Sequence, residues 1–149
     1  MDLNIDDLFE MLSWNSDSET QAKGRMIASQ IKSLFIFLQP TGNKSVWENC
    51  AKILSEKSDE NLEMYLYQLL EWIQDINWPG AFIVLDRMKR FSAKKIKGPL
   101  QYCIKQAMTS QDNEWLDYLS MLLDNSELLS VLEEECLMVL KKHRHDFIG

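Results

Sequence analysis

The chain has 149 residues, of which 46% are hydrophobic and 26% are charged, and its formal net charge is −7. This length favours one domain, and the composition is that of a globular protein rather than a disordered chain. No apolar run approaches the roughly 18 residues of a membrane helix, and the acidic N-terminus lacks the basic and apolar regions of a signal peptide. We therefore expect one domain over residues 1–149, located in the cytoplasm and without a membrane contact.

Apolar residues recur at helical spacing along the chain, and no segment alternates in the way of a β-strand. This spacing predicts a first helix over residues 5–12. A capping box that begins at Ser18 predicts the start of a second helix, whose apolar residues continue to Leu38. Pro40 and Gly42 then end this helix.

The middle of the chain is divided by further helix-start signals. Ser45 begins another capping box and predicts a third helix, and Ser58 predicts the start of a fourth that runs to Ile73. Pro79 suits the first turn of a fifth helix, where its missing N–H costs no hydrogen bond. Trp78 marks the boundary, because a residue before proline is pushed out of the helical region.

The remaining sequence predicts three more helices. Lys97, Gly98 and Pro99 interrupt the apolar pattern, so a sixth helix is expected to begin at Pro99. Asp112 is expected to cap a seventh helix and Ser126 an eighth. The connections between all these helices are short, which predicts that neighbouring helices pack antiparallel.

A weak internal repeat gives the expected arrangement of the helices. Trp78 and Trp115 lie 37 residues apart, and the same offset superimposes the apolar residues that follow each of them. A period near 40 residues is typical of HEAT-type helical repeats. We therefore predict an all-α fold of about eight helices, in which antiparallel pairs stack as a short HEAT-like α-solenoid. Residues 1–60 are expected to cap the stack, and residues 61–142 to form its HEAT-like part.

Two motifs carry a family resemblance. Residues 69–81 read LLEWIQDINWPGA, and Asp112 begins the sequence DNEW. Together they resemble the signature of a small bacterial domain family of unknown function with a HEAT-like all-helical fold, over roughly residues 62–125. Where other members have an aliphatic residue after the proline, this chain has Gly80, which predicts a looser helix start or closer backbone packing. Families of this type often lie beside toxin genes, so the resemblance implies a toxin-neutralising role and no catalytic residue.

The reactive side chains give little indication of catalysis. His143 and His145 lie in a polar C-terminal segment that we expect to be frayed and solvated, whereas a catalytic base is held by its neighbours. No glycine-rich phosphate loop is present. The three cysteines lack the spacing of a zinc site and are expected to be buried free thiols; they are Cys50, Cys103 and Cys136. We predict a protein that is not an enzyme and that has no metal or cofactor.

Charge is distributed unevenly along the chain. Residues 87–111 contain seven basic residues and no acidic one, so the rest of the chain carries a net charge of −14. An acidic surface of this kind favours a basic protein partner, such as a nuclease toxin with a positive substrate groove. The acidic candidates for partner binding are Asp75, Asp112, Asp117, Glu133 and Glu134. The basic candidates are Arg87, Arg90, Lys94 and Lys95.

Three interpretations of function remain open at this point. The first is a non-catalytic protein-binding module, specifically an immunity-type protein that neutralises a cognate bacterial toxin. The second is a nucleic-acid-binding or base-excision HEAT-like protein that uses the basic segment 87–105, with Asp75 and the tryptophans Trp72, Trp78 and Trp115 in a groove. The wider negative charge makes nucleic acid the less favoured partner. The third is a structural or adaptor protein.

Overall fold

The computed structural model describes the backbone of residues 4–148 and the side chains of residues 4–144. All regular structure in this part of the chain is helical, and none of it is β-strand. The predicted all-α class is therefore confirmed. None of the helices described has both the length and the apolar character needed to cross a membrane.

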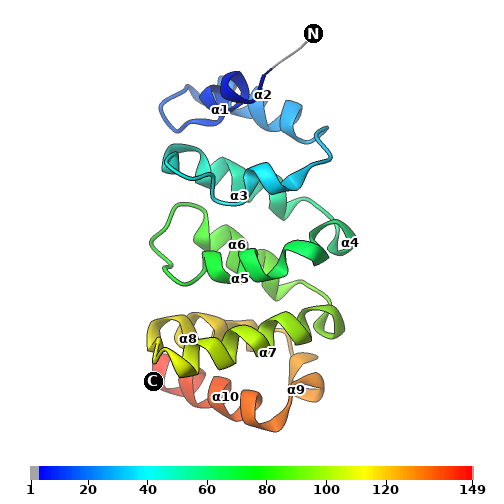
Figure 1. The fold of residues 1–149 in the computed structure, drawn as a ribbon, viewed down its shortest axis with the longest axis vertical. Helices are drawn as coiled ribbons and strands as arrows, with labels where there is room; N and C mark the ends of the chain where they lie inside the picture. Colours follow the sequence, from blue (N-terminus) through cyan, green and yellow to red (C-terminus); the bar gives the residue numbers. More distant parts are fainter. Residues whose placement is uncertain (1–3, 149) are drawn as a thin grey trace.

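The helices follow the chain as a stack of layers, with α1 at one end of the molecule and α10 at the other (Figure 1). The first layer contains α1 (Ile5–Leu12) and α2 (Ser18–Ala28). The second contains the 3-10 helices η1 (Leu34–Phe37) and η2 (Lys44–Val46) and the helix α3 (Trp47–Ser55). The third contains α4 (Asp59–Leu62), η3 (Glu63–Tyr65), α5 (Leu66–Trp72) and α6 (Ala81–Lys89).

Two further layers complete the stack. The fourth contains α7 (Ala93–Thr109) and α8 (Asn113–Ser120). The last contains η4 (Met121–Asp124), α9 (Leu128–Val131) and α10 (Glu134–Ile148). One continuous hydrophobic core connects all the layers, from Leu8 in α1 to Leu140 in α10. Its largest fully buried side chains are Trp72, Phe37 and Phe91.

The corner between α5 and α6 packs closely against α3. Gly80 has a φ of +84°, a conformation that side-chain-bearing residues rarely adopt. A Cβ atom on Gly80 would lie 2.7 Å from the Cβ of Ala51 and 2.9 Å from the carbonyl oxygen of Trp47, both in α3. Of the two effects predicted for this glycine, the structure therefore shows the closer packing. The left-handed residue also delays the start of α6 to Ala81, two residues after Pro79.

Tryptophan side chains fasten this corner to its neighbours. The indole Nε1 of Trp72 donates to the carbonyl oxygen of Pro79 at 3.0 Å, which closes the loop between α5 and α6. The Trp47 ring meets the Trp72 ring edge-to-face, with centroids 6.2 Å apart. In the next layer, the indole Nε1 of Trp115 donates to the carbonyl oxygen of Leu70 at 3.1 Å, which joins α8 to α5. These contacts connect the second, third and fourth layers.

The extents of the predicted sixth and second helices differ from those observed, and the predicted fourth helix is divided into α4, η3 and α5. The predicted break at Pro99 is wrong, because α7 continues through this proline. Ile96 and Leu100 are both buried on the two sides of Pro99, so packing outweighs the loss of about 3 kcal/mol for an interior proline. The second predicted helix is also too long. α2 ends at Ala28, and the chain then crosses to the second layer before η1 packs against α3.

Several predicted helix starts also move. Asp17 caps α2 instead of Ser18, by accepting a hydrogen bond from the Thr20 amide at 2.7 Å. The Ser45 hydroxyl donates to Asn43 and caps no helix. The eighth predicted helix, from Ser126, is divided into α9 and α10 by extended backbone at Leu132. The predicted starts at Ser58 and Asp112 are confirmed, since each side chain accepts a backbone N–H of the helix it precedes.

The 37-residue offset does not align equivalent elements. Trp78 precedes α6, whereas Trp115 lies within the first turn of α8. The apolar residues that the offset superimposes lie in α6 and in η4, and they coincide because apolar residues recur at helical spacing along the chain. The layered arrangement is therefore observed in the structure, and the 37-residue offset does not explain it.

Replacing Gly80 with Ala tests the close contact at the corner. We expect the free energy of unfolding to fall by about 2–4 kcal/mol, because the left-handed backbone and the overlap with Ala51 both penalise a side chain. Gly42→Ala is the matched control, since Gly42 also has a positive φ, of +75°, but a Cβ atom there would have no neighbour within 4 Å. Its expected loss is about 1–2 kcal/mol. Equal losses in urea unfolding would contradict the packing argument.

Candidate protein-binding surface

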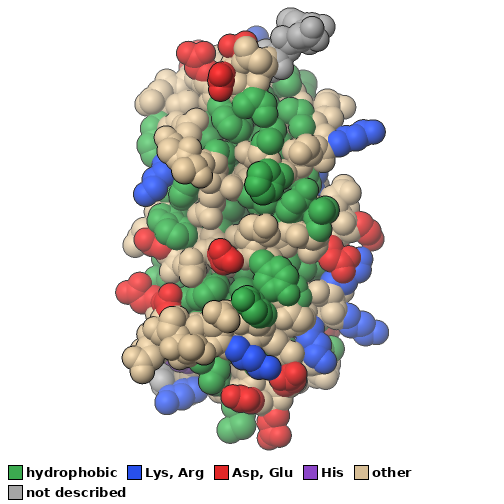
Figure 2. All heavy atoms as spheres, viewed as in Figure 1, with side chains coloured by type: hydrophobic (Ala, Val, Ile, Leu, Met, Phe, Trp, Pro, Cys, Tyr) green, Lys and Arg blue, Asp and Glu red, His purple; other side chains and the backbone are tan. Residues whose placement is uncertain are grey.

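Large hydrophobic side chains gather on one face of the stack, over η1, α5 and α7 (Figure 2). The exposed ones that these elements and the adjoining η3 contribute are Phe35 (66% exposed), Met64 (75%), Tyr67 (43%) and Tyr102 (53%). We call these four side chains the aromatic face. Single exposed apolar residues are ordinary on protein surfaces, whereas a row of them across several elements is typical of a binding surface.

Tyr67 and Tyr102 connect two layers of the aromatic face. Tyr67 lies on α5 and Tyr102 on α7, and their ring centroids are 5.3 Å apart. The planes of the rings are inclined by 85°, which is the favourable edge-to-face arrangement of two aromatic groups. Because each ring remains about half exposed, the pair can present the flat side of one ring and the edge of the other to a partner.

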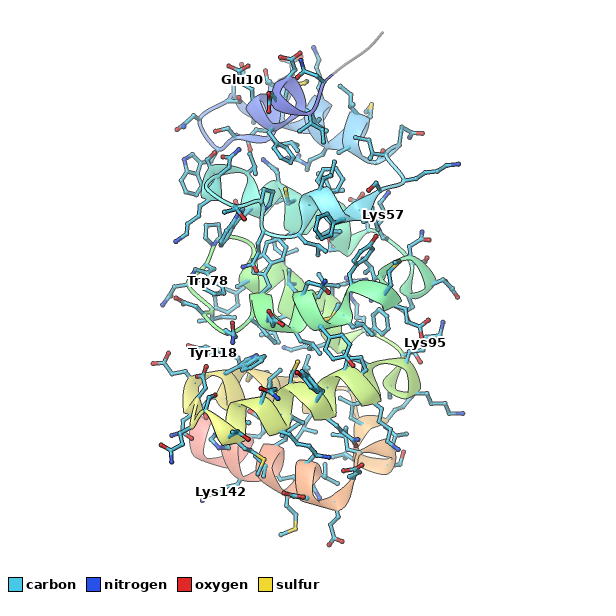
Figure 3. The ribbon with its side chains drawn as sticks, viewed as in Figure 1. Glu10, Lys57, Trp78, Lys95, Tyr118 and Lys142 are labelled. Carbon is cyan, nitrogen blue, oxygen red and sulfur yellow. The ribbon has the colours of Figure 1, made fainter. Side chains whose placement is uncertain are left out.

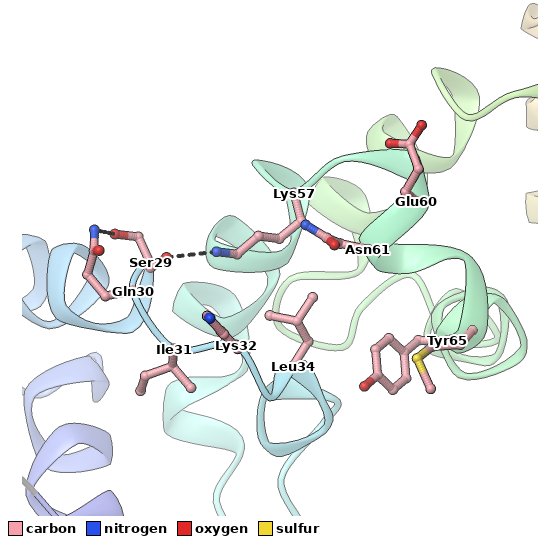
Figure 4. A pocket seen from close by; sticks show the side chains of 10 residues that line it. Ser29, Gln30, Ile31, Lys32, Leu34, Lys57, Glu60, Asn61 and Tyr65 are labelled. Carbon is pink, nitrogen blue, oxygen red and sulfur yellow. Dashed lines mark hydrogen bonds between the residues drawn. The ribbon is translucent and has the colours of Figure 1, made fainter.

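A pocket of about 530 Å³ adjoins the aromatic face near Met64 (Figure 4). It lies between residues 29–34, which follow α2, and the short helices α4 and η3. The Nζ of Lys57 closes one side of the pocket by donating to the Ser29 carbonyl oxygen at 2.9 Å. Leu34 and Tyr65 supply apolar wall, and Met64 belongs to both the pocket and the aromatic face. A partner that covers the aromatic face can therefore also insert a side chain here.

Four acidic residues lie on α5, on α8 and in the loop that follows α5. Burial raises the pKa of the Cys103 thiol to about 12, and the negative charge of Glu71 adds to this rise. Because Cys103 is a residue of α7, this effect places the Glu71 carboxylate close to that helix. Burial also raises the pKa of Tyr118, and the charges of Glu114, Asp75 and Asp117 raise it further. Figure 3 shows Tyr118 on the same side of the stack as Trp78. We call Glu71, Asp75, Glu114 and Asp117 the acidic edge.

The five acidic residues predicted as candidates do not form one patch. Asp75 and Asp117 both belong to the acidic edge, where Asp75 also accepts a hydrogen bond from the Asn77 amide at 2.9 Å. Asp112 caps α8 through the Trp115 amide. Glu133 pairs with Lys105 at 3.2 Å, and Glu134 is exposed in the first turn of α10. The structure thus brings together two of the five candidates.

The prediction of a frayed terminus at His143 is wrong. α10 continues past this residue and packs against α8. The Nδ1 of His143 lies 2.7 Å from the Oδ1 of Asp117, and both side chains are partly buried. The neighbouring Arg144 bonds Asp124 and so fastens α10 to η4. His145 lies outside the residues whose side chains are described.

The basic candidates divide into buried and exposed residues. Arg87 is only 6% exposed and donates from Nη2 to the Asp59 Oδ1 at 2.6 Å and to the Lys57 carbonyl oxygen at 3.0 Å. Arg87 therefore fastens α6 to the start of α4 instead of facing a partner. Lys95 lies within ion-pair distance of two acidic side chains, Glu60 and Glu63. Arg90 and Lys94 are exposed, and no ion pair joins them to a side chain within residues 4–144.

The remaining reactive groups lie in the interior. Cys50, Cys103 and Cys136 are buried free thiols, as predicted. Burial raises the pKa of Cys50 to about 12, which opposes formation of a reactive thiolate. Trp72 and Trp115 are buried, so neither ring is available to stack on a base. Within the part of the chain whose side chains are described, no cluster of three His, Cys, Asp or Glu residues has the arrangement of a metal site.

Residues 43–145 match the model of a family described as a domain of unknown function, DUF5071. The chain belongs to this family. The prediction of an uncharacterised domain family is confirmed, and the match is longer than the predicted resemblance over residues 62–125. It includes the Gly80 corner and both tyrosines of the aromatic face, whereas Phe35 precedes it. Neither the curated proteins nor the solved structures gave a match.

The sequence pattern did not identify the aromatic face. Phe35 falls among the apolar residues that were expected to continue the second helix to Leu38, and the structure instead exposes it on η1. A signal was nevertheless present for Tyr67, which lies outside the apolar stripe formed by Leu62, Leu66 and Leu69. An aromatic residue on the solvent side of a helix is the kind of residue that anchors binding surfaces.

The ion pair of Asp59 and Arg87 predicts a pH-dependent contribution to stability. Burial raises the pKa of Asp59, but hydrogen bonds from Arg87 and from the Ser92 amide, together with the charge of Arg87, lower it by more, and the net pKa lies below its ordinary value. A carboxyl whose pKa is lower in the folded state stabilises the fold above its unfolded pKa of roughly 3.9. This contribution is lost as the pH falls through the folded pKa.

We therefore expect Asp59→Asn to lower the free energy of unfolding by about 2–4 kcal/mol at pH 7, because Arg87 remains buried without its charged partner. The difference from the unmodified protein should persist down to about pH 4 and shrink below it. Denaturant unfolding across this pH range measures both effects. Asp86→Asn is the control, since Asp86 is exposed and 4.0 Å from Lys89; its expected effect is below about 0.5 kcal/mol. A pH-independent loss for Asp59→Asn would contradict the assignment.

Proposed function

We propose that the protein is a non-catalytic protein-binding module that holds a basic partner on the aromatic face and the acidic edge. The observation that carries this proposal is the row of exposed side chains from Phe35 to Tyr102, which crosses three layers of the stack. Interfaces are enriched in Tyr, Phe and Met at their centres and are polar at the rim. The acidic edge supplies such a rim, and its charge favours a partner of opposite sign.

The stacked layers are consistent with a short HEAT-like α-solenoid, in which successive helices present one extended binding surface. We infer that the partner is a toxin and that the protein is its immunity protein. A toxin that acts on nucleic acid has a positive substrate groove, and an acidic surface that covers this groove would block it. The complementary charges would also speed the encounter of the two proteins. The toxin-associated families that the Trp-Pro corner resembles support the same inference.

Binding of nucleic acid through the basic segment 87–105 has less support. Arg87 is buried against Asp59, and Lys89 lies 3.1 Å from Asp124. Lys105 is paired with Glu133 on α10. A protein gains affinity for nucleic acid when its Lys and Arg side chains neutralise phosphates and displace the counterions bound there. These three basic side chains already have carboxylate partners. A base-excision reaction has less support for a second reason, which is that the Trp72 and Trp115 rings are buried in the core.

Affinity purification of the tagged protein from a lysate of its host tests the proposal. We expect one stoichiometric basic protein to be retained, and the double charge reversal Glu71→Lys with Glu114→Lys to reduce its recovery at least tenfold at low salt. Glu10→Lys with Glu56→Lys is the matched control, because it changes the net charge equally at positions outside the acidic edge. Mass spectrometry identifies the retained protein.

Other results of this purification would contradict the proposal. Equal recovery with both double variants would exclude the acidic edge. A loss that occurs only with Glu133→Lys and Glu134→Lys would move the site to α10. Retention of nucleic acid that high salt releases, without a protein, would favour the basic segment instead.

A further inference from the structure

We propose that Tyr67, Tyr102 and Glu71 form a binding site for an arginine side chain of the protein partner. The inference rests on the proposed protein-binding function, and it names the chemical group that the partner presents to this surface. Its evidence is the arrangement of two half-exposed aromatic rings beside a carboxylate that is not engaged in an ion pair with the described side chains.

The tyrosine pair offers the flat face of a single ring, with the second ring standing beside it, which suits a guanidinium group. Since the two rings are inclined by 85°, one ring turns its edge to the other, and each is about half exposed. The negative face of an aromatic ring attracts a cation, and the planar guanidinium group stacks on such a face more readily than an ammonium group does. An arginine is therefore a better occupant of this surface than a lysine.

Glu71 completes the site because it follows Tyr67 by one helical turn. Residues at positions i and i+4 are neighbours on a helix surface, so the carboxylate of Glu71 and the ring of Tyr67 lie on the same side of α5. Glu71 also raises the pKa of Cys103, the residue next to Tyr102. A carboxylate beside an aromatic ring can accept two parallel hydrogen bonds from a guanidinium group that stacks on the ring.

Two lysines of α7, the helix that carries Tyr102, already lie beside acidic groups other than Glu71. Lys105, which follows Tyr102 by three residues on α7, lies 3.2 Å from the carboxylate of Glu133. Lys95, in the first turn of the same helix, lies near Glu60 and Glu63. No ion pair joins Glu71 to a side chain of residues 4–144. The negative charge of Glu71 is therefore matched by no cation of the described chain, and a cation from the partner would complement it.

Two synthetic peptides test the inference directly. One carries three arginines separated by single alanine or leucine residues, and its twin carries lysine at the same three positions. Titration of the ¹⁵N-labelled full-length protein maps the residues that respond. We expect the arginine peptide to shift the backbone amides of residues 63–71 and 98–106 most strongly, and to bind at least fivefold more tightly than its lysine twin.

Single substitutions assign the effect to the three side chains. Tyr67→Ala, Tyr102→Ala and Glu71→Gln should each weaken the arginine peptide at least fivefold and reduce the preference for arginine over lysine. Phe82→Ala is the control, because Phe82 is exposed on α6, which lies behind α5 in Figure 1. This variant should bind both peptides as the unmodified protein does. Unchanged chemical-shift dispersion in each variant shows that the fold is retained.

The inference is overturned if the two peptides bind equally, or if the shifts map to another surface. These outcomes differ from a failure of the proposed function. A host protein whose capture depends on Glu71 and Glu114, with no preference for the arginine peptide, would leave the binding function intact and remove the arginine site. Selective binding of the arginine peptide, lost in Tyr67→Ala, would support the site independently of which host protein is captured.

Discussion

The contact between Gly80 and α3 is the constraint on which the middle of the molecule depends. Only a residue without a side chain can bring the α5–α6 corner against Ala51 and the Trp47 carbonyl group. The Trp72 indole closes the same loop, and the Trp115 indole extends the connection from α5 to α8. The same helix α5 carries Tyr67 and packs against α7, which carries Tyr102, so the corner adjoins the helix that supplies one ring of the tyrosine pair.

Ion pairs within the chain determine which charged side chains remain free to attract a partner. The basic segment places Arg87, Lys89, Lys95 and Lys105 beside acidic side chains from other parts of the stack. A cation paired in this way stabilises the stack and contributes less to attraction of an external anion. Glu71 on α5 and Glu114 on α8 are exposed and have no ion pair with a described side chain, so their negative charge remains available at the surface.

A surface assembled from several layers has a consequence for binding. Phe35, Met64, Tyr67 and Tyr102 come from four different helical segments, each of which is held by buried neighbours. The backbone beneath such side chains loses little freedom when a partner docks, because buried neighbours already hold it in place. A layered helical fold can therefore present a preorganised surface without a deep pocket or a catalytic group, which agrees with the proposed role in holding another protein.

The sequence by itself determined the all-α class, the burial of the cysteines and the helix caps at Ser58 and Asp112. Periodicity and capping depend on residues three or four positions apart, and such local preferences are present in the chain before it folds. Only the tertiary structure decided that α7 continues through Pro99, that Arg87 is buried and that His143 bonds Asp117. It also decided which exposed aromatic residues lie side by side. These outcomes depend on partners from other helices, often more than 20 residues away in the chain, and local patterns do not specify those partners.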